Sequence, residues 1–292
     1  MTLWDRILQG VTAFSLENIV SAVASLVAAR LIFHYLPPSE YGVLALFLSF
    51  CATGRSLLNM GLGGLFVAEI ARARGAGAGG WARFLSKSYT LLLLSTSTAL
   101  LLCFIGLGLR LGNVVMWGIM GAYVWLTGPT AAAHGLFHGT TRYRRLAGQT
   151  IVRSVSRVGL LISLPWWWSG RLLTGVALTY PLMEFATGLV SLCMTRASWL
   201  DLASPAGAPH GFRDLRSLLA QQGLYAALIK PVKQIGDQLP LWFLKATVGD
   251  AAVGAYAAAA KAYSLVFPFF FSLEITLFPL VSEQVKIGDQ WE

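Results

Sequence analysis

The sequence predicts an all-α polytopic membrane protein with eight transmembrane helices. Of its 292 residues, 56% are hydrophobic and 12% are charged, against about 25% charged residues in a typical soluble domain. The apolar residues gather in eight runs, each close to the roughly 20 residues that a helix needs to cross a bilayer. The runs lack the period-two alternation of barrel strands, so helices are the structure that satisfies their backbone groups in lipid.

The eight predicted spans are joined by short connections, with one exception. The spans cover residues 11–33, 41–65, 86–110, 113–137, 150–169, 172–194, 217–246 and 251–282. The longest polar stretch, Thr195–Asp214, contains proline, glycine and serine and is typical of a linker. The sequence therefore divides into a six-helix bundle (residues 1–196), a cytoplasmic linker (197–216) and the first two helices of a second bundle (217–292).

Basic residues are distributed unequally between the two sides of the membrane. One set of connections and ends holds Arg6, Arg72, Arg74, Arg83, Lys87, Arg142, Arg144, Arg145, Arg153, Arg157, Arg196, Arg213, Arg216 and Lys286. The opposite connections hold Arg110, Arg171 and Lys245. Because cytoplasmic loops are enriched in lysine and arginine, we expect both termini in the cytoplasm and the protein in the inner (cytoplasmic) membrane. The net charge of +9 then reflects orientation rather than nucleic-acid binding.

Two segments, one near each end of the sequence, form a faint internal repeat. Leu36–Ala45 lies between the first two spans, and Val248–Ala257 lies between the last two. Both stretches form a short turn followed by a helix start of small residues, and Gly42 matches Gly254. The repeat agrees with the position of the linker and predicts two related halves, as in many transporters.

Ionisable residues inside the spans are the candidate functional residues, because a charge in a membrane is costly and usually faces a cavity or a partner. The candidates for a substrate cleft are Arg30, Arg55, Lys230, Lys233, Asp237 and Lys261. The candidates for binding a coupling proton or sodium ion are Glu17, Glu184 and Glu274.

Among the predicted spans, the seventh is the most informative about function. Lys230, Lys233 and Asp237 follow i, i+3, i+7 spacing and share one helix face, which predicts a wet cationic surface suited to an anionic headgroup. The alternative is that Lys233 and Asp237 neutralise each other while Lys230 reaches an interface. Arg30, Arg55 and Lys261 could likewise either face the cleft or lie outside it, with Arg30 reaching the membrane interface. The three glutamates could instead form an ion pair or a hydrated site.

The sequence does not predict a metal, a cofactor or a catalytic centre. His134 and His138 share a helix face, but no HExxH pattern and no third ligand accompany them, so we expect a solvated interfacial pair. Cys51, Cys103 and Cys193 lie in apolar runs and form neither a disulfide framework nor a zinc site. No GxSxG signature is present, and we expect no enzyme.

Four sequence elements together resemble the flippases of polysaccharide biosynthesis of the O-antigen exporter type. They are Ala29–Leu31 with Leu36–Gly42, then Asn59–Leu62, then Tyr143–Arg145 with Val152–Arg153 and Arg157–Val158, and last Val253–Tyr256 through Lys261 to Leu277–Pro279. That family belongs to the superfamily of multidrug, oligosaccharidyl-lipid and polysaccharide flippases. Asn59 stands where the family commonly has an acid, which weakens a charge role there. Members have two six-span bundles, so the resemblance implies that this chain is a fragment or a short, self-assembling form.

The resemblance implies a flippase that moves a polyprenyl-pyrophosphate-linked oligosaccharide across the cytoplasmic membrane by alternating access. Its partners would be membrane lipid, the lipid-linked glycan and proteins of polysaccharide polymerisation and assembly. One alternative is a cation-coupled drug antiporter, although five cations against four acids in the spans disfavour cationic substrates. Another is a non-transporting scaffold of a polysaccharide assembly complex. A polyprenyl glycosyltransferase would need a placed catalytic acid, which Asp201 or Asp214 alone does not supply.

Overall fold

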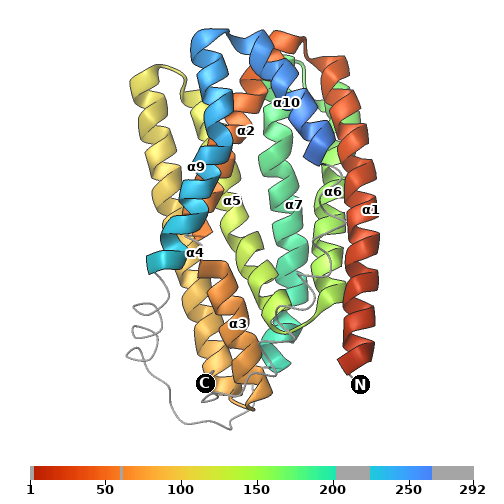
Figure 1. The fold of residues 1–292 in the computed structure, drawn as a ribbon. Helices are drawn as coiled ribbons and strands as arrows, with labels where there is room; N and C mark the ends of the chain where they lie inside the picture. The colour runs from red at the N-terminus through yellow and green to blue at the C-terminus, as the bar shows by residue number, and fades with distance from the viewer. Residues whose placement is uncertain (1–2, 60–61, 202–223, 265–292) are drawn as a thin grey trace.

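The protein is helical throughout the part that the computed structural model describes, which is residues 3–59, 62–201 and 224–264 (Figure 1). The described helices are α1 (Leu3–Tyr35), α2 (Pro38–Asn59), α3 (Leu62–Gly75), α4 (Gly79–Leu111), α5 (Val114–Gly139), α6 (Tyr143–Trp167), α7 (Leu172–Asp201), α9 (Leu224–Thr247) and α10 (Asp250–Ser264). They run along a common direction, and the α1–α2, α4–α5 and α9–α10 turns gather at one end of the bundle (Figure 1).

Four of the described helices are long and apolar enough to cross a membrane by length and composition: Ser15–Tyr35, Pro38–Leu58, Gly79–Leu111 and Leu172–Thr195. The expected count of eight spans stays a prediction. Helices α6 and α9 have the length of a span, at 25 and 24 residues, but they carry several charged side chains. The structure gives a reason for those charges, because many of them face the interior of the bundle.

The span expected at 41–65 is covered by α2, described to Asn59, and by α3, described from Leu62. One other predicted segment differs from the structure at its start. The fifth span, expected at 150–169, begins already at Tyr143 as α6. Its polar first turns extend the helix beyond the apolar run.

The structure corrects the placement of two basic residues. Arg153 and Arg157 were counted with a cytoplasmic connection, although the expected span 150–169 contains them, and both lie well inside α6. A partly buried arginine is tolerated where protein groups satisfy its hydrogen bonds. Arg153 donates to groups of α5 and α7, and Arg157 donates to the Tyr180 hydroxyl oxygen of α7. The charge asymmetry between the two ends of the bundle therefore rests on the other basic residues.

Helix α5 packs closely on α4 through glycines spaced seven residues apart. A Cβ atom at Gly128 would lie 2.9 Å from the Ser97 hydroxyl oxygen, and one at Gly135 would lie 2.7 Å from the Tyr89 ring. Such small residues let two helix backbones approach each other in a membrane protein. The close contact fixes α5 on one side and leaves its opposite face toward the interior.

Helices α2 and α10 cross at the two glycines that the internal repeat aligns. A Cβ atom at Gly42 would lie 1.9 Å from the carbonyl oxygen of Asp250, and one at Gly254 would lie 2.4 Å from the carbonyl oxygen of Pro38. In the aligned repeat Pro38 corresponds to Asp250, so the two contacts are reciprocal. Only glycine permits this approach, and the crossing is thereby fixed close to the α1–α2 and α9–α10 turns.

Candidate functional site

A cleft with two lobes lies between α2, α5 and α9. The first, which we call the histidine lobe, has a volume of about 510 Å³ and is lined by Arg55, Gly63, Gly64, Val67, Tyr89, Thr127, Thr130, Ala131, His134, Gly135, His138, Arg153 and Lys230. The second, the lysine lobe, has a volume of about 480 Å³ and is lined by Ala52, Arg55, Ser56, Leu58, Thr127, Ala131, Lys230, Lys233, Gln234 and Asp237. Four residues line both lobes, so the two lobes are adjacent, and we treat them as one site.

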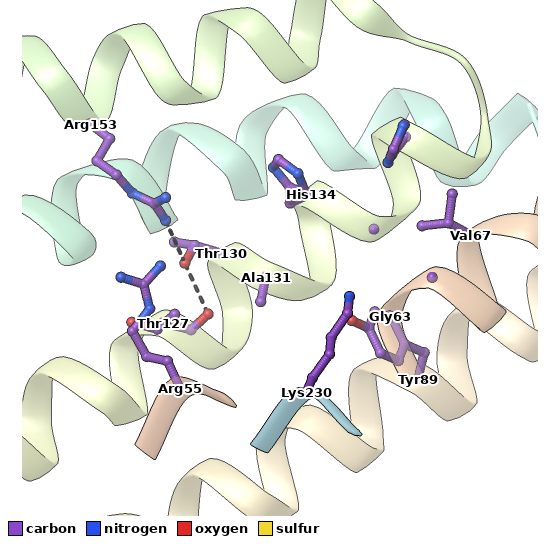
Figure 2. A pocket seen from close by; sticks show the side chains of 13 residues that line it. Arg55, Gly63, Val67, Tyr89, Thr127, Thr130, Ala131, His134, Arg153 and Lys230 are labelled. Atoms are coloured by element: carbon purple, nitrogen blue, oxygen red, sulfur yellow. Dashed lines mark hydrogen bonds between the residues drawn. The ribbon is translucent and has the colours of Figure 1, made fainter. Parts of the chain in front are cut away.

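Three cationic side chains approach the histidine lobe from three different helices. Figure 2 shows Arg55 of α2, Arg153 of α6 and Lys230 of α9 around a common space. Thr127 and Thr130 of α5 add hydroxyl groups to the same wall. The site therefore offers charge-assisted hydrogen bonds from several directions, which is the arrangement that suits a polyvalent anion.

The predicted cationic face of α9 lies on the lysine lobe. Lys230, Lys233 and Asp237 all line that lobe, together with Gln234. In the described part of the chain, no ion pair within 4.0 Å joins Lys233 to Asp237. Both ammonium groups are therefore available to a ligand in the lobe.

Arg55 is held in place by a chain of arginine–tyrosine contacts. Its Nη1 atom donates a 2.9 Å hydrogen bond to the Tyr123 hydroxyl oxygen, and the guanidinium lies 5.7 Å from the centre of that ring. The Tyr123 ring meets Tyr180 edge-on at 5.7 Å. Arg157 in turn donates a 2.8 Å hydrogen bond to the Tyr180 hydroxyl oxygen and lies 4.9 Å from the centre of its ring. The chain ties α2, α5, α7 and α6 together behind the cleft.

A buried carboxylate lies directly behind the histidine lobe. Glu184 of α7 is 0% exposed, and its Oε2 atom accepts a 2.9 Å ion-paired hydrogen bond from Arg153 Nη2. Thr130 Oγ1 also lies 2.9 Å from Oε2. Gln149 donates to the Thr130 carbonyl oxygen at 2.8 Å and to Ser191 at 3.0 Å. Polar groups of α5, α6 and α7 thus form one network next to the cleft.

The other sequence candidates lie elsewhere. Glu17 of α1 hydrogen-bonds Thr150 and interacts electrostatically with Arg153, which connects it to the same network. Arg30 is exposed on α1, and Lys261 of α10 is partly buried near Arg157. Neither Arg30 nor Lys261 is among the described residues that line the two lobes.

One further sequence candidate, Glu274, lies outside the described residues. Arg153 was missed as a lining residue, although the predicted span 150–169 already contained it.

The histidines were expected as a solvated interfacial pair. The structure places His134 and His138 on the wall of the cleft, with ring centres 6.3 Å apart. Which side of a helix faces a cavity depends on its neighbours, and the apolar pattern of α5 alone does not identify that side.

Comparison with known proteins identifies the family of this chain. The model of a family described as polysaccharide biosynthesis protein matches residues 7–285, nearly the whole chain. No curated protein matches.

Several solved structures share the fold at low sequence identity. One described only as protein A superposes with a TM-score of 0.76 at 15% identity, covering 97% of this chain and 66% of that one. A MOP superfamily transporter from Pyrococcus furiosus, reported with a binding pocket of reverse polarity, has a TM-score of 0.69 at 16% identity and coverages of 95% and 64%. An outward-facing multidrug resistance MATE family transporter of the same superfamily has a TM-score of 0.70 at 16% identity, with coverages of 95% and 64%. The chain thus has the fold of MOP superfamily transporters and spans less than two thirds of the length of these structures.

Proposed function

The chain belongs to the polysaccharide biosynthesis protein family, and we propose that it acts in moving a polyprenyl-pyrophosphate-linked oligosaccharide across the cytoplasmic membrane. The observation that supports this most directly is the charge of the cleft. Arg55, Arg153, Lys230 and Lys233 line it, and Asp237 is the one carboxylate among the described residues of its two lobes. A site with this excess of cations favours an anionic ligand over a cationic one.

The chemistry of a pyrophosphate headgroup fits these side chains. Guanidinium groups bind phosphate oxygens in a fixed, often bidentate geometry, and ammonium groups bind them as mobile point charges. Arg55 and Lys230 line both lobes, so a diphosphate held between them would leave the rest of the cleft for sugar residues. Thr127 and the two histidines supply hydrogen-bonding groups of the kind that bind sugar hydroxyls.

We infer that contacts between α2 and α9 close the cleft toward the end of the bundle that holds the α1–α2 turn. Trp242 of α9 donates a 2.8 Å hydrogen bond to Ser49 of α2 and stacks on Phe50 with ring centres 5.5 Å apart. Beyond this layer α2 and α10 meet at Gly42 and Gly254. We infer an alternating-access cycle in which these contacts separate to release the glycan outside.

The orientation in this proposal follows from loop charge. The α3 end of the bundle carries Arg72 and Arg74, and the α5–α6 turn beside it carries Arg142. The positive-inside rule places this end and both termini in the cytoplasm. The cleft would then load from the cytoplasmic side, where lipid-linked oligosaccharides are built.

A drug antiporter is the second candidate, because solved structures with this fold include MATE transporters. Antiporters of cationic drugs need carboxylates in the cleft, and the excess of cations here argues against that substrate class. A scaffold role in an assembly complex does not account for the positive charge of the cleft.

Ligand binding by the purified chain tests the proposal. Lys230→Gln removes a cation shared by both lobes, and Arg30→Gln removes an exposed cation of α1 that lines neither. A charge-assisted hydrogen bond contributes about 1.5 to 3 kcal/mol, which corresponds to a loss of roughly 10- to 100-fold in affinity. We expect that loss for farnesyl pyrophosphate with Lys230→Gln only. Equal affinity of the two variants, or equal affinity for farnesyl pyrophosphate and farnesol, would overturn the proposal.

A further inference from the structure

Two buried tyrosines lie between two arginines behind the cleft. Tyr123 of α5 and Tyr180 of α7 are 5% and 4% exposed, and both rings belong to the apolar core of the bundle. Each hydroxyl oxygen accepts a hydrogen bond from one arginine, Tyr123 from Arg55 and Tyr180 from Arg157. We call these four residues the arginine–tyrosine array. Because close-packed side chains have little freedom to move, the two hydroxyl oxygens are fixed points for the two guanidinium groups.

The array lies one helical turn away from the ion pair of Arg153 and Glu184. On α6 Arg157 follows Arg153 by four residues, and on α7 Tyr180 precedes Glu184 by four residues, so each pair shares a helix face. In one turn the arginine donates to a carboxylate, and in the next it donates to a phenol. A carboxylate neutralises the arginine that it holds. A neutral phenol holds an arginine and leaves its positive charge available.

Arg55 is the member of the array that reaches the ligand space, because it lines both lobes of the cleft. Among the described residues, its hydrogen-bond partner is Tyr123, and this contact uses one of the five N–H donors of a guanidinium group. The other donors remain for a ligand. Tyr123, Tyr180 and Arg157 are not among the described residues that line the lobes, so they act on a ligand only through Arg55.

Fixing Arg55 in advance favours binding for an entropic reason. A long side chain that is free in the empty site has to be ordered when the ligand arrives, which lowers the affinity by about 2- to 12-fold. A guanidinium that is already held avoids this loss and presents its planar fork to phosphate oxygens in a constant geometry.

We propose that Tyr123, Tyr180 and Arg157 are positioning residues, which hold the guanidinium of Arg55 in a charged and preorganised orientation for an anionic ligand in the cleft. This inference rests on the proposed function for the identity of the anion. Tyr123 acts directly on Arg55, and Tyr180 acts by packing edge-on against Tyr123 at 5.7 Å. Arg157 fixes Tyr180 by a hydrogen bond and by stacking over its ring. The effect of a substitution should therefore decrease from Tyr123 to Tyr180 to Arg157.

Other contacts of the array have to be separated from this effect. Arg157 also interacts electrostatically with Tyr41 of α2 and Lys261 of α10. Tyr41→Phe is the matched control, because it removes a phenol oxygen near the same arginine. In the described part of the chain, Tyr41 has no hydrogen bond or ring contact with Arg55 or Tyr123. Arg157→Lys keeps the positive charge and removes the planar fork, so it separates positioning from long-range charge.

The orientation of Arg55 is tested without any ligand. NMR relaxation of isotope-labelled arginine side chains in the purified chain measures their mobility, and the Arg55 signal is assigned by its loss in Arg55→Lys. We expect Arg55 to become more mobile in Tyr123→Phe, and less strongly so in Tyr180→Phe. Its mobility should stay unchanged in Tyr41→Phe. Unchanged mobility of Arg55 in Tyr123→Phe, or an equal increase in Tyr41→Phe, would overturn the positioning role.

The consequence for binding is tested with inorganic pyrophosphate as the probe. We expect Tyr123→Phe to lower the affinity by about 2- to 12-fold, the cost of ordering one side chain. Tyr180→Phe and Arg157→Lys should have smaller effects, and Tyr41→Phe none. In an Arg55→Gln background all of these substitutions should leave the affinity unchanged, because residues that act through Arg55 have nothing left to position. A general loss of packing would instead lower the affinity equally in both backgrounds, and that result would contradict the inference.

The two experiments also separate this inference from the proposed function. Mobility of Arg55 that depends on Tyr123, together with no pyrophosphate binding by the unsubstituted chain, would overturn the anion-binding function and leave the positioning role intact. Pyrophosphate binding that is weakened by Arg55→Gln but not by Tyr123→Phe would overturn the positioning role and leave the function intact.

Discussion

Replacing Gly42 by alanine should disrupt the crossing of α2 and α10. The new Cβ atom would lie 1.9 Å from the Asp250 carbonyl oxygen, about 1.5 Å short of the 3.4 Å at which ordinary contact begins. The obstructing atom is backbone, so relief requires the two helices to move apart. Overpacking of this kind costs about 1 to 3 kcal/mol, and a backbone obstruction belongs at the upper end, near 3 kcal/mol.

Gly236→Ala in α9 is the matched control, because nothing lies within 4 Å of the position of its Cβ atom. Alanine in place of glycine within a helix is favourable by up to about 1 kcal/mol, and because both glycines lie in helices this gain cancels between the two variants. We therefore expect Gly42→Ala to be less stable than Gly236→Ala by about 3 kcal/mol. Equilibrium denaturation in mixed micelles, followed by circular dichroism, measures the free energies of unfolding. Equal stability of the two variants would refute the packing argument.

The same variant tests the closure of the cleft. Since the crossing lies between the lysine lobe and the outer end of the bundle, its separation should open a path from outside. A cysteine at Ser56, which lines the lysine lobe, should react faster with an impermeant maleimide in the Gly42→Ala background than in the Gly236→Ala background. Equal labelling rates would contradict a closing role for this contact.

Three further predictions concern the polar network and the topology. Tyr123→Phe removes the acceptor of the Arg55 hydrogen bond and should lower the free energy of unfolding by about 1 kcal/mol in the same denaturation assay. Arg153→Met leaves a buried carboxylate unpaired and should lower it by about 3 kcal/mol, the low end for a buried pair, because Arg153 keeps 27% exposure. In a cysteine-free background, a cysteine at Ser39 should be labelled from outside the cell, and one at Ala76 only after permeabilisation. The opposite pattern would reverse the orientation.

The helical class of this protein could be predicted from local sequence because its cause is local. A run of apolar residues long enough for a bilayer must form a helix to satisfy its backbone. The i, i+3, i+7 spacing of Lys230, Lys233 and Asp237 likewise places them on one face of α9, whatever packs beside it. Family resemblance added the expected substrate class, and the matching family model agrees with that resemblance.

The role of Arg153 could not be predicted in this way. Arg153 was counted with a cytoplasmic connection although the expected span 150–169 contains it, and it lies inside the bundle against α5 and α7. Which groups surround a polar side chain within a span depends on the neighbouring helices, which hydropathy does not describe.

The sequence by itself determined that this is a helical membrane protein with ionisable residues inside its predicted spans, because length, apolarity and periodicity act within one segment. Only the tertiary structure decided which of those charges meet. Arg153 and Glu184 are 31 residues apart, and Gly42 and Gly254 come from opposite ends of the chain. Such pairs depend on the rotation and crossing of whole helices, which the packing of every neighbouring side chain sets together.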